Sequence, residues 1–233
     1  AWQANKDGIK NLDYSTSPNL GGFWQDCTRE IFGLSGGGPP YGCQAGTVMA
    51  MSSMASESEK PEHPYSQYSG CSEQRKYNLA QGIQDVTEET VKKYIEKHLG
   101  ENTNLCLSGG VVLNCVLTGQ IKSWFPQIKN VFVPPVPYDA GLAIGCVQYF
   151  LKEQLNQNLI IDELFDSPYL GKSYSDEDIS NALEEFIGNV ETVQCSDLDA
   201  AKLLTEKNII SVYGGKSESG RRALGNRSIL ADP

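Results

Sequence analysis

The segment LCLSGGVVLN, residues 105–114, decides the fold class of this chain. Its first three residues, Leu105–Leu107, form an apolar run of the length of a short buried strand. The Ser-Gly-Gly that follows predicts a tight turn. Apolar residues within 112–119 then recur at the spacing of a helix. A strand that passes through glycines into a helix is typical of α/β proteins, so we expect this class.

The same alternation continues on both sides of this segment. Upstream, Thr87 followed by two glutamates predicts the start of a helix, and Gly100 predicts its end. Downstream, Val131–Val133 predicts a second strand. Asp139 can cap a further helix, whose apolar positions lie within residues 142–150. The central part of the chain is therefore predicted to contain strands and helices in turn.

A second region follows an exposed link near residues 162–168. Ser175 predicts the start of a helix and Gly188 its end. Another helix is predicted over Asp197–Lys207, and a strand over Ile209–Tyr213. The apolar residues that we expect the first of these helices to bury are Ile179, Leu183, Phe186 and Ile187.

Residues 1–85 show the weakest periodicity. Residues 35–40, Ser-Gly-Gly-Gly-Pro-Pro, predict a turn or flexible loop, and the polar residues 56–76 predict a loop or insertion. The chain starts at Ala1 rather than Met and stops soon after a dense cluster of Gly and Arg. We therefore expect a piece of a longer protein.

Charge and hydropathy exclude two classes of function. The formal net charge is −10, and residues 151–200 carry all of it, with 12 acidic and two basic residues. An acidic chain without a basic stripe is a poor nucleic-acid binder, because neutralised phosphates supply that affinity. No apolar stretch approaches the roughly 20 residues that a membrane helix needs. We therefore expect no nucleic-acid partner and no membrane association.

The seven cysteines do not form a recognisable framework. Their number is odd and no pair has CxxC spacing, which argues against both a disulfide scaffold and a zinc ribbon. Cys106, Cys115 and Cys146 have apolar neighbours and are predicted to be small core residues. A reducing, cytoplasmic compartment fits this usage best.

Three segments could carry chemistry. In the first, the turn at Gly109 and Gly110 would place backbone N–H groups at a helix N-terminus, which favours a phosphate. Asn114, about one turn into that helix, could hydrogen-bond a sugar or phosphate. In the second, Asp139 lies at the end of a strand, where a carboxylate could hold a metal bridging nucleotide phosphates. A plain tight turn and a plain N-cap are the respective alternatives.

The third segment is the glycine- and arginine-rich run of residues 214–228. Arg221, Arg222 and Arg227 follow a predicted strand, and arginine forks bind phosphate and carboxylate in bidentate fashion. The Gly-Lys-Ser at 215–217 does not make a P-loop, because the required first glycine would fall at Ile210. The alternative interpretation is a solvated basic loop.

Taken together, these segments resemble the motifs of a carbamoyltransferase family. The family pattern contains GGVxLN, PxxxDxGxAxG, SPYLG and GRxExGPRALGxRSI segments in this order. The corresponding residues here are Gly109–Asn114, Pro135–Gly145, Ser167–Gly171 and Gly215–Ile229. On these residues the chain is similar to NodU-like and antibiotic O-carbamoyltransferases, and the resemblance covers most of its length.

The resemblance implies an α/β protein with two domains. Residues 1–162 would be the latter part of an actin-like ATPase (Kae1-like) domain, and residues 163–233 the start of a YrdC-like domain. The implied enzyme makes carbamoyladenylate from carbamoyl phosphate and ATP, then transfers the carbamoyl group to a hydroxyl of a small-molecule acceptor. ATP and a divalent metal, with iron among the candidates, are the implied cofactors, and a homodimer is one implied assembly.

The resemblance also assigns roles to individual residues. They are nucleotide binding for Gly109, Gly110, Asn114, Glu218 and Ser228, metal binding for Asp139, and catalysis with binding of the polyanionic substrates for Arg222 and Arg227.

Two positions depart from the family pattern. Lys216 stands where the family has Arg, and Arg221 stands where it has Pro. The family's histidine metal ligands lie upstream of the matched segments and have no counterpart here. We therefore expect the 233 residues alone to be catalytically incomplete. Two other readings stay open, namely a small-molecule kinase of actin-like fold and a non-catalytic nucleotide-binding or interaction module.

Overall fold

A computed structural model describes residues 1–5, 8–16, 18–35, 43–157, 167–193 and 195–232. The chain divides into two compact units, Ala1–Val133 and Pro134–Pro233, and each is described by itself. The expected domain boundary after residue 162 falls outside the described residues. The expected loop at residues 35–40 also lies outside them, apart from Ser35.

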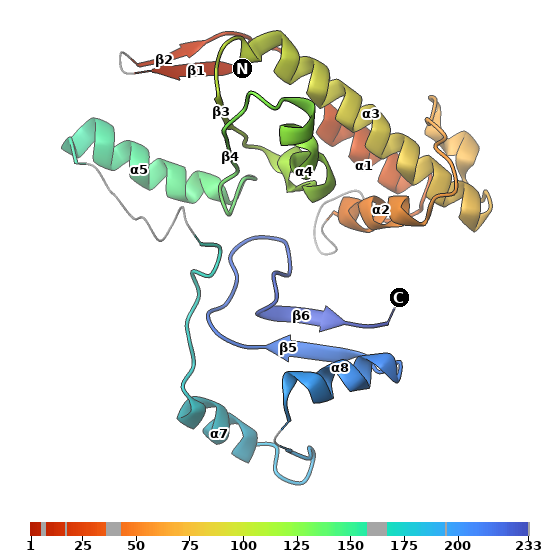
Figure 1. Ribbon diagram of the computed structural model, residues 1–233, viewed down its shortest axis with the longest axis vertical. Coiled ribbons are helices and arrows are strands. Elements are labelled where there is room, and N and C mark those ends of the chain that lie inside the picture. The colour runs from red at the N-terminus through yellow and green to blue at the C-terminus, as the bar shows by residue number, and fades with distance from the viewer. Residues whose placement is uncertain (6–7, 17, 36–42, 158–166, 194, 233) are drawn as a thin grey trace. The chain divides into compact units, whose positions relative to one another are not determined.

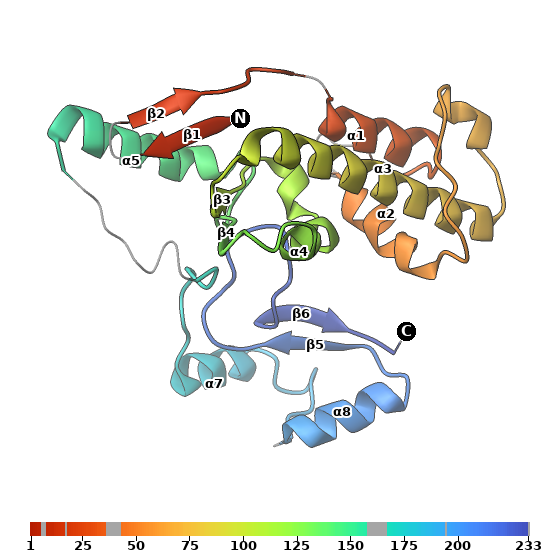
Figure 2. The same ribbon diagram turned by 45° about the horizontal axis from the view of Figure 1, so that its top comes forward.

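Three helices build one half of the first unit (Figures 1 and 2). They are α1 (Leu20–Glu30), α2 (Ala45–Met51) and α3 (Glu73–Leu99), and they pack against one another. Short 3-10 turns, η1 (Ser52–Met54) and η2 (Tyr65–Tyr68), lie between α2 and α3. The buried apolar side chains between these elements are Trp24, Cys27, Ile31, Phe32, Val48, Tyr68, Leu79, Ala80 and Ile83.

Helix α3 is longer than its sequence pattern predicts. Its N-cap is Ser72, whose side chain accepts a hydrogen bond from the N–H of Arg75. The predicted start at Thr87 is wrong, because that hydroxyl is buried within α3 and donates to the carbonyl of Ile83 at 2.7 Å. A threonine satisfied in this way fits a helix interior and does not mark a start. The predicted end is confirmed, since Gly100 caps the helix with a φ of 54°.

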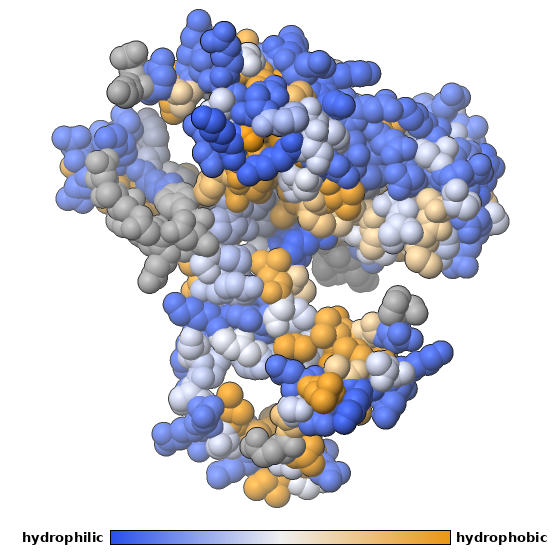
Figure 3. Space-filling view, in the orientation of Figure 1, coloured by the Kyte–Doolittle hydropathy of each residue, from blue (hydrophilic) through white to orange (hydrophobic). Residues whose placement is uncertain are grey.

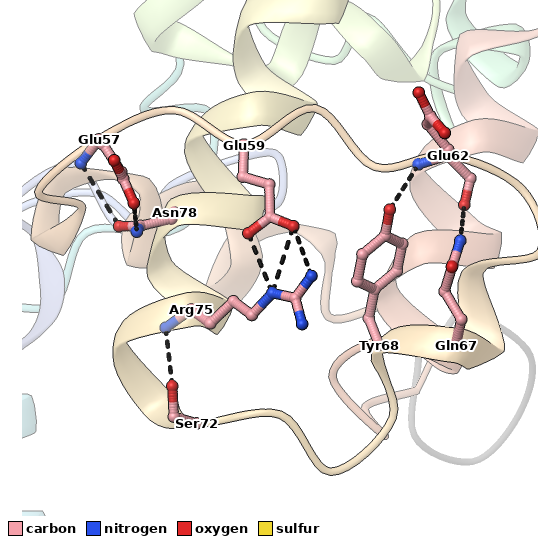
Figure 4. A network of polar contacts seen from close by, with 8 residues as sticks. All are labelled: Glu57, Glu59, Glu62, Gln67, Tyr68, Ser72, Arg75 and Asn78. Carbon is pink, nitrogen blue, oxygen red and sulfur yellow. Dashed lines mark hydrogen bonds and ion pairs between the residues drawn. The ribbon is translucent and has the colours of Figure 1, made fainter.

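The loop or insertion predicted for residues 56–76 is confirmed in part, since residues 56–72 contain η2 but no strand or α-helix, whereas residues 73–76 belong to α3. Residues 57–62, here called the strap, run along α3 (Figure 4). The carboxylate of Glu59 accepts from Nε and Nη2 of Arg75 at 2.8–3.2 Å. A Cβ on Gly82 would overlap the backbone carbonyl of Glu59, so the strap approaches α3 as closely as a glycine allows.

The other half of the first unit contains the predicted strand–turn–helix segment. Strands β3 (Asn104–Cys106) and β4 (Asn130–Phe132) pair in parallel, which confirms both strand predictions. Between them lie η3 (Gly110–Leu113) and α4 (Cys115–Trp124). Strands β1 (Trp2–Asn5) and β2 (Gly8–Asn11) form a separate antiparallel hairpin. The buried apolar residues of this half are Ile95, Leu99, Leu117, Ile121, Phe125 and Ile128.

The second unit contains helices α5 (Gly141–Leu155), α7 (Asp176–Glu184) and α8 (Asp197–Thr205), and an antiparallel pair of strands. These strands are β5 (Ile210–Tyr213) and β6 (Arg227–Leu230). Capping boxes, from Ser175 with Asp178 and from Ser196 with Asp199, begin α7 and α8 and confirm the predicted starts.

Burial in the second unit differs from the prediction. Pro137 is the only buried residue among those described there. Helix α7 ends at Glu184, before Gly188, and the four side chains expected to be buried are exposed, Ile187 by 78%. Apolar side chains are open over β5, β6 and α8 (Figure 3). The pattern fixes which face of a helix is apolar, but only a neighbouring element can cover that face.

The cysteine predictions have a mixed outcome. All seven cysteines are free. Cys106, Cys115 and Cys146 are exposed rather than in the core, whereas Cys27 is buried. Desolvation, with the nearby charges of Asp26 and Glu30, raises the pKa of the Cys27 thiol to about 12.

Helices and small two-stranded sheets are mixed along the chain, which is compatible with the α/β class. The assignment of Kae1-like and YrdC-like domains stays a prediction. Within the described ranges, no helix combines the length and the apolar composition that crossing a bilayer would require.

Candidate functional site

The predicted phosphate turn lies on an exposed edge of the first unit. Gly109 has a φ of 108°, which only glycine adopts readily. A Cβ at Gly109 or Gly110 would meet no atom within 4 Å, so the space over this turn is open. The four-residue η3 separates the turn from α4. The backbone N–H groups of the turn therefore do not form the N-terminus of the α-helix, contrary to the expectation.

Asn114 is the N-cap of α4 rather than a residue within it. Its Oδ1 accepts from the N–H of Leu117 at 3.1 Å, and its Nδ2 donates to Oε1 of Gln84 at 2.7 Å. In return, Nε2 of Gln84 donates to Oδ1 of Asn114 at 3.3 Å. Both side chains are buried. Asn114 thus joins the turn segment to α3, and contact between its side chain and a nucleotide stays a prediction.

Asp139 precedes α5 but does not cap it. The N-cap is Ala140, no side chain caps the helix, and only the backbone carbonyl of Asp139 accepts, from the N–H of Leu142 at 3.0 Å. The capping expectation is therefore wrong, and the Asp139 side chain is exposed. Across the described ranges, no three His, Cys, Asp or Glu side chains gather closely enough to hold a metal. A metal site at Asp139 stays a prediction.

The glycine- and arginine-rich segment forms the connection between β5 and β6. Residues 214–226 are here called the arginine loop. Near its middle, Oε1 of Glu218 accepts from three backbone N–H groups, those of Asn226 at 2.7 Å, Leu224 at 2.8 Å and Arg227 at 3.3 Å. Desolvation acts to raise the pKa of Glu218, but these hydrogen bonds and the charge of Arg227 outweigh it and lower the pKa.

Arg227, the first residue of β6, anchors the base of this loop. Its Nη1 donates to the carbonyls of Gly214 at 2.7 Å and Asn226 at 2.6 Å, and its Nη2 donates to Oγ of Ser217 at 3.0 Å. The guanidinium also lies over the ring of Tyr213. These contacts direct the Arg227 fork toward its own loop, and contact with a substrate stays a prediction.

Residues 167–171, the SPYLG motif, brace the arginine loop from outside. The hydroxyl of Tyr169 donates to the carbonyl of Leu224 at 2.8 Å. The N–H of Ser219 donates to the carbonyl of Pro168 at 2.7 Å, and the N–H of Gly171 donates to the carbonyl of Ser217 at 2.9 Å. Two motifs that are far apart in the sequence therefore form one structural element.

A third motif joins them within the same unit. The guanidinium of Arg221 lies 4.8 Å from the centre of the Tyr138 ring. A Cβ at Gly220 would lie 3.0 Å from the carbonyl oxygen of Pro135. The segment that carries Asp139 therefore contacts the arginine loop. Sequence reasoning missed the contacts of Tyr138 and Tyr169, although both lie within the matched motifs.

The remaining predicted residues also lie in or beside the arginine loop. Arg222 is half-buried within it. The hydroxyl of Ser228 accepts from the N–H of Gly225 at 3.0 Å, so this serine shapes the return of the loop. The predicted residues Asp139, Glu218, Arg222, Arg227 and Ser228 thus lie in the second unit. Gly109, Gly110 and Asn114 lie in the first.

Comparison with known proteins finds two family models that match the parts of the chain containing these motifs. Residues 49–147 match the family model described as carbamoyltransferase N-terminus, and residues 201–233 match carbamoyltransferase C-terminus. The first match includes the turn at Gly109 and the segment of Asp139, and the second includes the arginine loop.

Curated relatives agree with these matches. The nodulation protein NolNO of Sinorhizobium fredii is 35% identical over 169 residues, which are 69% of this chain and 24% of the relative. An uncharacterized protein, sll1178, of Synechocystis is 34% identical over 69% of this chain and 27% of its own length. Nodulation protein U of Azorhizobium caulinodans is 34% identical over 55% of this chain and 21% of the relative. The chain thus spans about a quarter of the length of these relatives.

Proposed function

The chain belongs to the carbamoyltransferase family, with NodU-like relatives, and we propose that it contributes to the transfer of a carbamoyl group to a hydroxyl. The donor in this proposal is carbamoyl phosphate. In this proposal water first cleaves carbamoyl phosphate to carbamate and inorganic phosphate. A carbamate oxygen then attacks the α-phosphorus of ATP, which gives carbamoyladenylate and releases pyrophosphate. The hydroxyl of a small-molecule acceptor finally attacks the carbamoyl carbonyl, loses its proton and displaces AMP. A homodimer and a cytoplasmic location remain part of the same proposal.

The braced arginine loop is the observation that carries this proposal. Carbamoyl phosphate and ATP are polyanions, and arginine binds such groups with a planar fork of donors. Arg222 lies in a loop held by Glu218, by Arg227 and by the motif around Tyr169. A loop that is already ordered loses less entropy when an anion binds. We therefore assign the binding of the phosphate group of carbamoyl phosphate to Arg222.

The turn of the first unit has a second role in the proposal. Gly109 and Gly110 expose their backbone beside open space, as a loop that approaches a nucleotide phosphate requires. For a metal, the described residues do not assemble a set of ligands around Asp139. The mechanism proposed here therefore has no step that passes through a metal.

Formation of labelled carbamoyladenylate tests the proposal. The protein from the complete gene is mixed with ATP and radiolabelled carbamoyl phosphate, and adenylate and pyrophosphate are measured. We expect label in the adenylate, and a decrease of at least about tenfold in Arg222→Ala, since a charge-assisted hydrogen bond contributes about 1.5–3 kcal/mol. Lys202→Ala, which removes an exposed charge paired only loosely with Asp199, should keep wild-type activity.

Two results would contradict the proposal. Absence of adenylate in a correctly folded wild-type protein would exclude carbamoyl activation and favour a kinase or a non-catalytic module. Equal losses in Arg222→Ala and Lys202→Ala would remove the specific role of the arginine loop.

A further inference from the structure

We propose that Glu218 is a positioning residue, whose carboxylate holds the arginine loop in the shape that binds an anion. The inference rests on the proposed function for the identity of that anion, the phosphate group of carbamoyl phosphate. It assigns Glu218 a role through the loop backbone and not through direct contact with the ligand.

The charge of Glu218 is the wrong sign for an anion site. A carboxylate within a loop that binds phosphate repels the ligand by Coulomb's law. If the loop binds an anion, Glu218 must therefore favour binding by a route other than direct electrostatic attraction. Three backbone N–H groups donate to Oε1 of Glu218 and hold the loop in one shape. Backbone donors that converge in this way form an anion-binding concavity. Glu218 fills this concavity from within the chain.

These hydrogen bonds connect the two limbs of the arginine loop. Glu218 lies on the limb that leaves β5, whereas Leu224 and Asn226 lie on the limb that returns to β6. The connection shortens the span between the two linked points of the loop to residues 219–223, which contain Arg221 and Arg222. A shorter loop has fewer conformations to lose when it orders, so this connection favours the binding shape before the ligand arrives.

The neighbouring contacts support the same reading. Arg227 closes the base of the loop on the carbonyl of Gly214, and Arg221 holds the tip against Tyr138. Glu218 lies between these two points, and no residue from 214 to 226 is buried among the described residues. The lowered pKa of Glu218 is consistent with a carboxylate that stays ionised to accept backbone N–H groups.

Anion affinity separates positioning from a simple effect of charge. Binding of carbamoyl phosphate and of inorganic phosphate is measured by calorimetry on the purified wild-type protein, Glu218→Gln and Glu218→Ala. Glu177→Gln, in the exposed first turn of α7, serves as the matched control because it also removes one negative charge. If Glu218 acts as charge alone, its neutralisation strengthens binding. If it positions the loop, binding weakens.

We expect affinity for both anions to fall about tenfold in Glu218→Ala and less in Glu218→Gln, whose amide oxygen still accepts hydrogen bonds. Glu177→Gln should bind as the wild type does. Unchanged or tighter binding in Glu218→Ala would overturn the inference. Direct nucleotide contact would appear as a loss of ATP affinity in Glu218→Ala while phosphate affinity stays unchanged, and that result also overturns it.

Amide hydrogen exchange keeps the inference separate from the proposed function. The backbone N–H groups of Leu224 and Asn226 should lose protection in Glu218→Ala and retain it in Glu177→Gln. If the wild type binds neither anion, the proposed function fails at this loop, and exchange alone decides whether Glu218 holds it. Unchanged protection in Glu218→Ala would then refute the positioning role.

Discussion

The two units of this chain are stabilised in different ways. The first contains two clusters of buried apolar side chains, on either half of α3. In the second, only Pro137 is buried among the described residues, and helix caps, backbone hydrogen bonds and cation–π contacts hold the visible elements. A unit with a buried core tolerates most substitutions at its surface. A unit held by individual hydrogen bonds and cation–π contacts is sensitive to the substitution of single polar residues. Most of the predicted site residues belong to the second unit, which depends more on single polar contacts.

The largest expected effect tests whether the core is confined to the first unit. Ile83→Ala removes a fully buried side chain and should lower the free energy of unfolding by about 2–5 kcal/mol. Ile229→Ala removes the same atoms from a side chain that is 77% exposed and should change it by less than about 0.5 kcal/mol.

Urea denaturation followed by tryptophan fluorescence provides the measurement for Ile83→Ala, since all three tryptophans lie in the first unit. Loss of the circular dichroism signal reports on the whole chain and serves for Ile229→Ala. A destabilisation by Ile229→Ala as large as that by Ile83→Ala would mean that the second unit has an apolar core after all.

A smaller effect concerns the strap. Gly82→Ala places a methyl group where the carbonyl of Glu59 lies, so either α3 or the strap must shift. Overpacking of this kind costs about 1–3 kcal/mol. Gly119→Ala is the matched control, because that exposed position in α4 has no atom within 4 Å and alanine favours a helix by up to about 1 kcal/mol.

The same fluorescence-detected unfolding applies to both variants. We expect Gly82→Ala to shift the midpoint to lower urea and Gly119→Ala to leave it unchanged or raise it. Equal midpoints in the two variants would show that the strap does not rest tightly on α3.

The smallest effect is a pH dependence confined to the arginine loop. The folded pKa of Glu218 is lowered from the ordinary value of 4.5, so the ionised carboxylate stabilises the loop. This contribution is fully present above pH 4.5 and is lost as the pH falls through the lowered value. The amide signals of Leu224 and Asn226 in NMR spectra should therefore shift together below pH 4.5. In Glu218→Gln this shared shift should disappear, and its persistence would assign the titration to another group.

Local signals in the sequence predicted much of the secondary structure. Ser175 and Ser196 satisfy N–H groups next to them in the chain, and Gly100 adopts a φ that few other residues allow. These features depend on neighbours within a few residues, so the sequence alone identifies them. The start of α3 was predicted wrongly because threonine is a common N-cap residue. The hydroxyl of Thr87 instead donates a hydrogen bond to the carbonyl of Ile83 within the helix.

Burial and side-chain partners were harder to predict. Ile179 and Leu183 lie in α7 as predicted, whereas Phe186 and Ile187 lie beyond its end, and all four side chains are exposed. Nothing in the sequence says whether another element covers such apolar side chains. For the candidate site, the motifs indicated which residues to consider and not what each one contacts. Arg227 and Ser228 are predicted substrate ligands, yet their hydrogen bonds shape their own loop. Such contacts depend on how distant segments fold back, which residue spacing does not encode.

The paired amides of Asn114 and Gln84 have a mechanical consequence. The side chain of Asn114 caps the first turn of α4 and also hydrogen-bonds Gln84 near the middle of α3. A displacement of the segment after the glycine turn would therefore have to break these hydrogen bonds or move α3, a helix of 27 residues. Because α3 contributes side chains to both apolar clusters, the amide pair connects the segment after the glycine turn to the one element that the two clusters share.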